Sequence, residues 1–490
     1  MLSARSRQRG VSLLPRRLAL SSVFIAAILL LLPQPAWAAA GLDGAAMRWP
    51  YALPFTGLLL SIALGPLLFA KVWHHHYGKI AAAWSLLALG ALVVFAGGMA
   101  TLAVLVHAML AEYLGFIVLL FSLYVVAGGI LVTGDIKGTP AANTGILALG
   151  TLMASVVGTT GAAMILVRPL IRANRPRRQN AHVVIFFIIL VANVGGALTP
   201  LGDPPLFVGF LHGVDFFWTT RTIWLQTMIV AGLLLAIFVA IDVWHFRSEP
   251  PVRDAAPAEP VRIRGLVNLA LIAAIVASLL VSAMWEPGIS FDVLGTKLEL
   301  QDVSRNAALL AIAALSVWLT PEEHRQANGF TWEPIREVAK LFAGIFVAII
   351  PVIAMLDAGH HGAFAWLLSA VTAPDGTPRE AAYFWFTGLM SAFLDNAPTY
   401  LLFFELAGGD PQVLMHGLSG TLASISMGAV YMGALTYIGN APNFMVSSIA
   451  SQNGIAMPSF FGYLLRAGAV LIPMFLLLTV LPVAPILHWH

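Results

Sequence analysis

Two ten-residue segments of this chain combine small, hydroxyl and proline residues in a pattern that could bind an ion. Residues 196–205 read Gly-Ala-Leu-Thr-Pro-Leu-Gly-Asp-Pro-Pro, and residues 433–442 read Gly-Ala-Leu-Thr-Tyr-Ile-Gly-Asn-Ala-Pro. They agree at six of ten positions and lie 237 residues apart. Proline removes a backbone donor and crowds the preceding turn, so both segments are predicted to break a helix. The carbonyl and amide groups that the break frees could bind a cation or an anion.

Two aspartates lie in polar breaks within apolar stretches of the chain. Asp203 belongs to the first segment, and Asp395 lies in a second polar break at residues 394–400. A carboxylate at membrane depth costs about 2.5–3.5 kcal/mol on insertion scales and marks a functional site by default. Burial favours the protonated carboxyl and bound Na⁺ favours the carboxylate, so one Asp could exchange a proton for a cation. The alternative is that each Asp only caps a half-helix.

Other residues in the same breaks carry oxygen atoms that could complete an ion and proton site. The candidate residues are Asp203, Asp395, Asn396, Thr199, Gly202, Thr159, Thr160, Thr399, Thr436, Asn440 and Asn443. Asp203 and Asp395 are the candidate Na⁺ ligands. We expect no cofactor, with Na⁺ and H⁺ as transported or coupling ions. The sequence contains no P-loop, no His-Glu-x-x-His and no Gly-x-Ser-x-Gly motif, so it predicts neither nucleotide-driven pumping nor a familiar hydrolase.

The composition places these breaks in a membrane. The chain has 490 residues, of which 59% are hydrophobic and 10% charged, and its mean hydropathy is +0.87. Soluble domains carry about 25% charged residues. The apolar runs predict an all-α membrane protein with about 10–12 membrane-crossing or re-entrant segments. The absence of cysteine excludes disulfides and iron–sulfur clusters. Because Lys and Arg gather in short clusters beside apolar runs, we expect the lipid bilayer as a partner and no nucleic acid.

The chain is predicted to consist of a signal peptide and two transmembrane halves. Residues 1–38 carry five arginines, an apolar stretch and a terminal Ala-Trp-Ala, which predicts cleavage after Ala38. An uncleaved anchor helix is the alternative. Residues 50–246 and 265–485 are the first and second transmembrane repeats, and the proline- and arginine-rich residues 247–264 are a cytoplasmic linker. We expect a multi-pass protein of a bacterial inner membrane.

The 237-residue offset also predicts how the two halves are oriented. It aligns residues 158–163 with residues 395–400, although few residues there are identical. It also aligns residues 168–178, which hold five arginines, with residues 405–417, which hold no Lys or Arg. Because basic loops stay in the cytoplasm, these two loops are predicted to lie on opposite sides of the membrane. The halves are therefore predicted to be inverted-topology repeats.

Residues 193–205, 394–400 and 436–443 resemble the ion transporter superfamily, and within it the NhaD-type sodium/proton antiporters and the related citrate transporters. The likeness runs from about residue 50 to the C-terminus. It implies two inverted repeats with re-entrant hairpins and a central site, often in a homodimer. The carboxylate carriers of the superfamily look similar but typically place Ser-Asn-Thr at both hairpin tips. This chain has Gly158-Thr159-Thr160 at one tip and Asp395-Asn396 at the other.

The charges in the breaks bear on the transported substrate. Asp203 and Asp395 would repel a citrate trianion unless Na⁺ or protons neutralised them, and neither break contains Lys or Arg. This favours a secondary active sodium/proton antiporter that exchanges Na⁺ or Li⁺ for H⁺. The alternative is a Na⁺- or H⁺-coupled transporter of citrate or another carboxylate. An intramembrane aspartyl hydrolase is a third hypothesis, but repeated broken helices argue against it, so we do not expect an enzyme.

Overall fold

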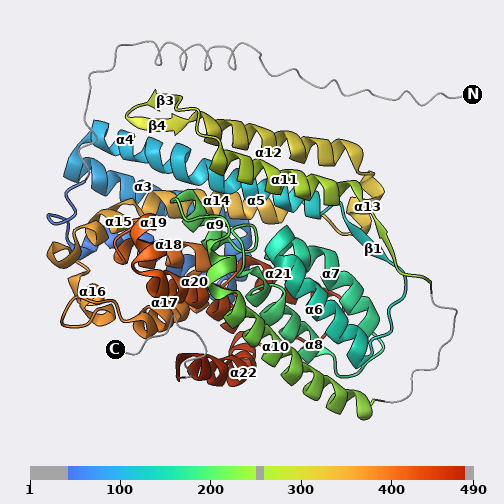
Figure 1. Ribbon diagram of the computed structural model, residues 1–490. Helices are drawn as coiled ribbons and strands as arrows, with labels where there is room; N and C mark the ends of the chain where they lie inside the picture. Colours follow the sequence, from blue (N-terminus) through green and yellow to red (C-terminus); the bar gives the residue numbers. More distant parts are fainter. Residues whose placement is uncertain (1–41, 250–258, 481–490) are drawn as a thin grey trace, which may run out of the picture.

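The computed structural model describes residues 42–249 and 259–480, and this part of the chain is mostly helical (Figure 1). The predicted signal peptide and most of the predicted linker lie outside the described residues. Within these described ranges, seven helices are long and apolar enough to span a membrane, or eight if the bent pair formed by residues 333–357 is one span. The described residues therefore form an all-α, multi-pass membrane protein, as predicted.

The first half begins with four α-helices. The last two are joined by a π-helical turn into one continuous helix. These elements are η1 (Trp49–Ala52), α2 (Leu53–Leu68), α3 (Ala70–Ala96), α4 (Gly98–His107), the π-helical turn η2 (Ala108–Tyr113) and α5 (Leu114–Ala127). Side chains such as Leu86 and Val94 of α3 are exposed. Apolar side chains on the outside of a spanning helix face lipid, because the helix satisfies its own backbone groups.

The rest of the first half contains a helical hairpin and the first broken segment. It comprises β1 (Leu131–Thr133), α6 (Pro140–Val157), α7 (Thr159–Asn174), α8 (Ala181–Leu190), η3 (Val194–Gly196), α9 (Pro204–Leu211) and α10 (Trp218–Arg247). Thr139 caps α6 by accepting a hydrogen bond from the N–H of Ala142, and Pro140 occupies the first turn. Gly158 has a φ of +80° and reverses the chain between α6 and α7.

The second half starts with two long helices and ends with a second hairpin and broken segment. Its first elements are β2 (Arg262–Arg264), α11 (Val267–Met284), β3 (Ser290–Val293), β4 (Thr296–Glu299), α12 (Leu300–Leu319), α13 (Glu322–Ala327), α14 (Glu333–Ala348), α15 (Ile350–Asp357), η4 (Gly359–His361) and α16 (Ala365–Val371). Its last elements are α17 (Glu380–Leu394), α18 (Asn396–Leu406), α19 (Pro411–His416), α20 (Ser419–Met432), η5 (Gly433–Leu435), α21 (Ala441–Gln452) and α22 (Phe460–Val480).

The long helices surround the short ones. In Figure 1, α3, α4, α5, α11 and α12 lie together on one side, and α6, α7, α8 and α10 lie on another. The short helices α9 and α18 pack against each other between these groups, and α17 packs against α20. Strand β1 pairs with β2 in antiparallel register and joins the halves next to the linker. The breaks between short helices are thus enclosed by protein, as backbone at membrane depth requires.

A buried ionic cluster holds the first hairpin at the linker end of α10. An oxygen of Asp242 lies 2.6 Å from Nη2 of Arg177 and 2.8 Å from Nε2 of His182. Asn143 donates a hydrogen bond of 3.0 Å to the other carboxylate oxygen. Because buried charges are stable only when paired, this cluster fixes α6, α7 and α8 against α10.

The two broken segments share their local geometry. In each one, the second glycine of the motif packs against the backbone of the first: Gly202 meets Gly196, and Gly439 meets Gly433. A side chain at either position would collide with that carbonyl, which explains why both glycines are needed. The threonines of the two segments also make equivalent hydrogen bonds. Thr199 donates to the backbone carbonyl of Ser155, and Thr436 donates to that of Ala392, each near the end of a hairpin helix. The opposite orientation of the two halves in the membrane stays a prediction.

The orientation can be tested by cysteine labelling, because the native chain contains no cysteine. Ser248 follows α10 at the linker, and Gln412 lies in the short helix α19, after α18; both are exposed. We expect a membrane-impermeant maleimide applied to intact cells to label Gln412→Cys but not Ser248→Cys, and to label both after the cells are opened. Labelling of both variants in intact cells, or of Ser248→Cys alone, would contradict the predicted topology.

Candidate functional site

The Asp203 carboxylate accepts hydrogen bonds from three other side chains at the beginnings of the short helices. Its side chain is buried, with 1% of the residue exposed. Thr159 Oγ1 donates to one carboxylate oxygen over 3.0 Å, and Asn440 Nδ2 donates to the same oxygen over 2.9 Å. Asn396 Nδ2 donates to the other oxygen over 2.5 Å. Four candidate residues that are far apart in the sequence therefore meet at one carboxylate.

The folding of the breaks explains why these residues meet. Helices α7, α9, α18 and α21 all begin at this site, at or next to Thr159, Asp203, Asn396 and Asn440. The first turn of each helix has amide N–H groups without an intrahelical partner and carries a partial positive charge. Four such ends stabilise negative charge at the point where they converge. The arrangement favours a carboxylate there even though the site is buried.

The two aspartates differ in whether their side chains cap the helix that follows. Asp203 occupies the N-cap position of α9 in extended conformation, but its side chain makes no hydrogen bond to that helix. Asp395 does cap its own helix, because its Oδ1 accepts from the N–H of Ala397 over 3.3 Å. Asp395 therefore caps its helix through its side chain, whereas Asp203 does not. A role in ion binding stays a prediction for both.

A cavity of about 90 Å³ lies beside the carboxylates. Its polar lining includes Thr159, Thr160, Asp203, Asp395 and Asn440. Of the described residues that line it, none is Lys, Arg or His. The nearest fixed charges around this space are therefore the two aspartates, and a cation entering the cavity would be attracted to them.

One acceptor in the site has no partner. Asn396 is fully buried, and within the described part of the chain its Oδ1 accepts no hydrogen bond. An unsatisfied buried acceptor costs about 1–3 kcal/mol. This oxygen is an acceptor in the same side chain that donates to Asp203, and a role for it in binding a cation stays a prediction.

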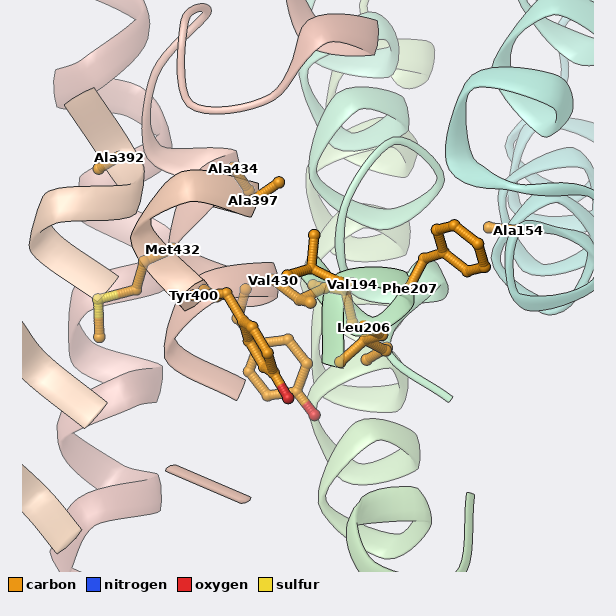
Figure 2. Close-up of a cluster of buried hydrophobic side chains, with 14 of the residues drawn as sticks. Ala154, Val194, Leu206, Phe207, Ala392, Ala397, Tyr400, Val430, Met432 and Ala434 are labelled. Carbon is orange, nitrogen blue, oxygen red and sulfur yellow. The ribbon is translucent and has the colours of Figure 1, made fainter. Parts of the chain in front are cut away.

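Apolar side chains enclose the polar centre. Figure 2 shows Phe207 of α9 and Tyr400 of α18 among buried residues, with Ala397 and Ala434 near the helix ends. Water is largely excluded from such surroundings, which strengthens each electrostatic interaction inside them. The protonation and ion occupancy of Asp203 are therefore tightly coupled to the groups that touch it.

Asp395 has a backbone conformation that normally belongs to glycine. Its φ and ψ are 75° and 143°, close to the values of 80° and 150° at Gly158, the equivalent position of the other hairpin tip. A residue with a Cβ atom in this region is strained by about 1–3 kcal/mol. Strain of this kind is characteristic of functional positions, and here it places a carboxylate at the edge of the cavity.

Several predicted residues support the site without touching Asp203. Thr160 lines the cavity. Gly202 accepts a hydrogen bond from the N–H of Thr159 over 2.8 Å, and Thr399 donates to the carbonyl of Asp395 over 2.8 Å. Asn443 donates to the carbonyls of Gly433 and Thr436 over 2.9 Å each. Together with the threonine contacts of Thr199 and Thr436, these bonds fix the broken backbone around the cavity.

Sequence reasoning missed the role of Asn193, although this residue begins the motif that carries the resemblance. Asn193 Nδ2 donates to Asn443 Oδ1 over 2.7 Å, and Asn440 Nδ2 lies 3.4 Å from Asn193 Oδ1. Asn193 thus links the first broken segment to the second. One sequence feature could have identified Asn193: it is an amide residue at the end of the apolar run of α8, where the chain must leave the helix.

The strain at Asp395 predicts an unusual order of stability. We expect Asp395→Gly to be more stable than Asp395→Ala, because glycine relieves the strain whereas alanine keeps it and loses the cap. Gly158→Ala is the matched control and should lower the free energy of unfolding by about 1–3 kcal/mol. Thermal unfolding of the purified variants in detergent measures the order. An alanine variant at least as stable as the glycine variant would show that position 395 is not strained.

Comparison with known proteins identifies the family of the chain. No curated protein sequence matches the chain significantly. Residues 44–483, however, match the family described as putative citrate transport. The match covers the hairpins, both broken segments and all the residues around Asp203. It also confirms the resemblance to the citrate transporter group. By this match over most of its length, the chain belongs to the putative citrate transport family and is a multi-pass membrane transport protein.

Proposed function

We propose that the protein is a secondary active transporter that moves a small carboxylate such as citrate together with Na⁺ or H⁺ bound at Asp203. The observation that carries the proposal is the buried Asp203 carboxylate, held by Thr159, Asn396 and Asn440. Membership in the putative citrate transport family supports a carboxylate as the cargo. The setting is a membrane, which we propose to be a bacterial inner membrane.

The charges of the site give a physical reason for coupling. With Asp203 and Asp395 both ionised, a carboxylate substrate entering the cavity would be repelled. Na⁺ or H⁺ on Asp203 reduces this repulsion, and the partial positive charges of four helix N-termini then favour the substrate. Cation binding and substrate binding then favour each other, which is the energetic requirement for cotransport.

One observation favours a second function, sodium/proton antiport. The cavity is lined by two carboxylates and, among the described residues, by no basic side chain. A site that only has to bind Na⁺ and H⁺ in turn needs no group for an organic anion. Asp203 would then release its proton when Na⁺ binds and take it back when Na⁺ leaves.

Purified protein in proteoliposomes separates the two functions. We expect labelled citrate to accumulate when a Na⁺ or H⁺ gradient is imposed, and Asp203→Asn to reduce uptake to that of empty vesicles because the amide neither binds a proton nor neutralises Na⁺. Asp292→Asn, a substitution on the exposed β3–β4 hairpin, is the control and should transport normally.

Other outcomes of the same assay would contradict cotransport. If Na⁺ dissipates a pH gradient without any carboxylate and citrate does not accumulate, antiport replaces cotransport. If neither process occurs with the wild-type protein, or if Asp203→Asn transports like the wild type, the proposed function is contradicted.

A further inference from the structure

A second group of ionisable side chains lies at the far end of the helices that begin at Asp203 and Asn396. His212 directly follows α9, and Glu405 lies in the last turn of α18. Nε2 of His212 is 3.9 Å from Oε1 of Glu405. Because α9 and α18 pack against each other along their length, this pair is joined to the central site by two parallel helices.

The continuous helix formed by α4, η2 and α5 adds a second imidazole–carboxylate pair. Nε2 of His107 is 3.7 Å from Oε1 of Glu112. Glu112 lies in the π-helical turn, a local irregularity that is frequent at functional sites. Leu211, the neighbour of His212, lies against Gly115, three residues after Glu112, so the two pairs are close to each other. The two pairs therefore form one group, which we call the outer cluster: His107, Glu112, His212 and Glu405.

Other charged groups lie near the outer cluster. Asp357 ends α15, which packs against α18, the helix that carries Glu405. Strand β4, which carries Lys297 and Glu299, packs against η2. Arg305 of α12 approaches the cluster at Gly115, but its Nη1 pairs with Asp302 over 2.7 Å. A carboxylate that pairs with an imidazole in partly buried surroundings can share a proton with it.

The outer cluster is less enclosed by protein than the central site. The side chains of Glu112, Glu405 and His212 are 19%, 13% and 21% exposed, and that of His107 is 59% exposed. The cluster lies at the opposite end of α10 from the linker, since α10 runs from Trp218, near His212, to Arg247. We therefore expect protons to enter the cluster from the end opposite the linker.

Apolar side chains separate the cluster from Asp203. A void of about 10 Å³ between them is lined by Val208 of α9, Ala397 and Leu401 of α18, and Phe342 of α14. It is too small and too apolar to hold a chain of water molecules. The hydroxyl of Tyr400 packs against Gly209 in the same layer. In this structure the apolar layer closes the direct route from the cluster to the central cavity.

We propose that the outer cluster is a second proton-binding site, which loads and unloads the Asp203 site when the apolar layer between them opens. The proposal rests on the proposed function, because it assumes that cation-linked transport occurs at Asp203. The ligand is H⁺ rather than a divalent metal, since no group of three or more His, Asp or Glu side chains in the described residues is arranged to hold a metal ion.

Kinetic measurements on two variants test the role. We expect Glu112→Gln and Glu405→Gln to lower the maximal transport rate at least about tenfold, because a proton relay supplies rate factors of that order or larger. The apparent KM for the substrate should change by less than about threefold, because the central site is intact. Glu286→Gln, on an exposed residue after α11, is the matched control and should behave like the wild type.

A measurement on the wild-type protein tests the proposal even if the variants fail to fold. Dicyclohexylcarbodiimide modifies protonated carboxyl groups in apolar surroundings. We expect mass spectrometry to find adducts on Glu112 or Glu405 at pH 6, to find fewer at pH 8.5, and to find none on Glu286.

The outcomes distinguish this proposal from the proposed function. If the wild type transports and both Gln variants match Glu286→Gln, the outer cluster has no role in proton transfer. Absence of adducts from both glutamates would overturn the proposal as well, even if the variants were unstable. If the wild type transports nothing while the glutamates are modified as expected, the proposed function and the loading role both fail, and only proton binding by the outer cluster remains.

Discussion

The structure depends on one carboxylate that is buried where four helices begin. Asp203 is surrounded by protein, so its charge is tolerable only if hydrogen-bond donors and helix N-termini replace the water it has lost. Thr159, Asn396 and Asn440 are the side-chain donors, and each stands at the beginning of a different helix. This requirement explains why the chain breaks its helices in the middle of apolar stretches. Continuous helices would have no N-termini at this depth.

The site is built from equivalent positions that carry different charges. Thr159 and Asn396 are 237 residues apart, as are Asp203 and Asn440, and all four meet. The hairpin tips show the same relation, since Gly158 and Asp395 share a backbone conformation while only the second carries a carboxylate. Two negative charges are thus present instead of four. Fewer charges reduce repulsion within the site and leave amide groups to bind the carboxylate that remains.

The sequence predicted the centre of the site because its residues belong to recognisable breaks. Proline, glycine and aspartate within apolar runs identified Asp203, and the 237-residue offset identified Asn440 as its counterpart. Thr159 and Asn396 followed because they begin the helices after the hairpin tips. The membrane class and helical fold followed from composition alone.

Other features depended on contacts between distant segments, which sequence spacing does not reveal. Asn193 joins Asn443 across 250 residues, and the cluster of Arg177, His182 and Asp242 draws on three segments. The positive φ of Asp395 could not be predicted either, because an aspartate at that position suggests an ordinary N-cap. Glu405 appeared in the sequence only as a charge at the start of a loop. The structure shows it on a helix, facing His212.

Equilibrium binding of ²²Na⁺ to the purified protein tests most directly whether the Asp203 carboxylate is the cation-binding charge. Binding should weaken as the pH falls, and Asp203→Asn should abolish it. The double variant Asp203→Asn/Asn440→Asp should recover part of it, because the new carboxylate stands at the equivalent position, where the two side chains are 2.9 Å apart. Sodium binding by Asp203→Asn with wild-type affinity and pH dependence would contradict the account.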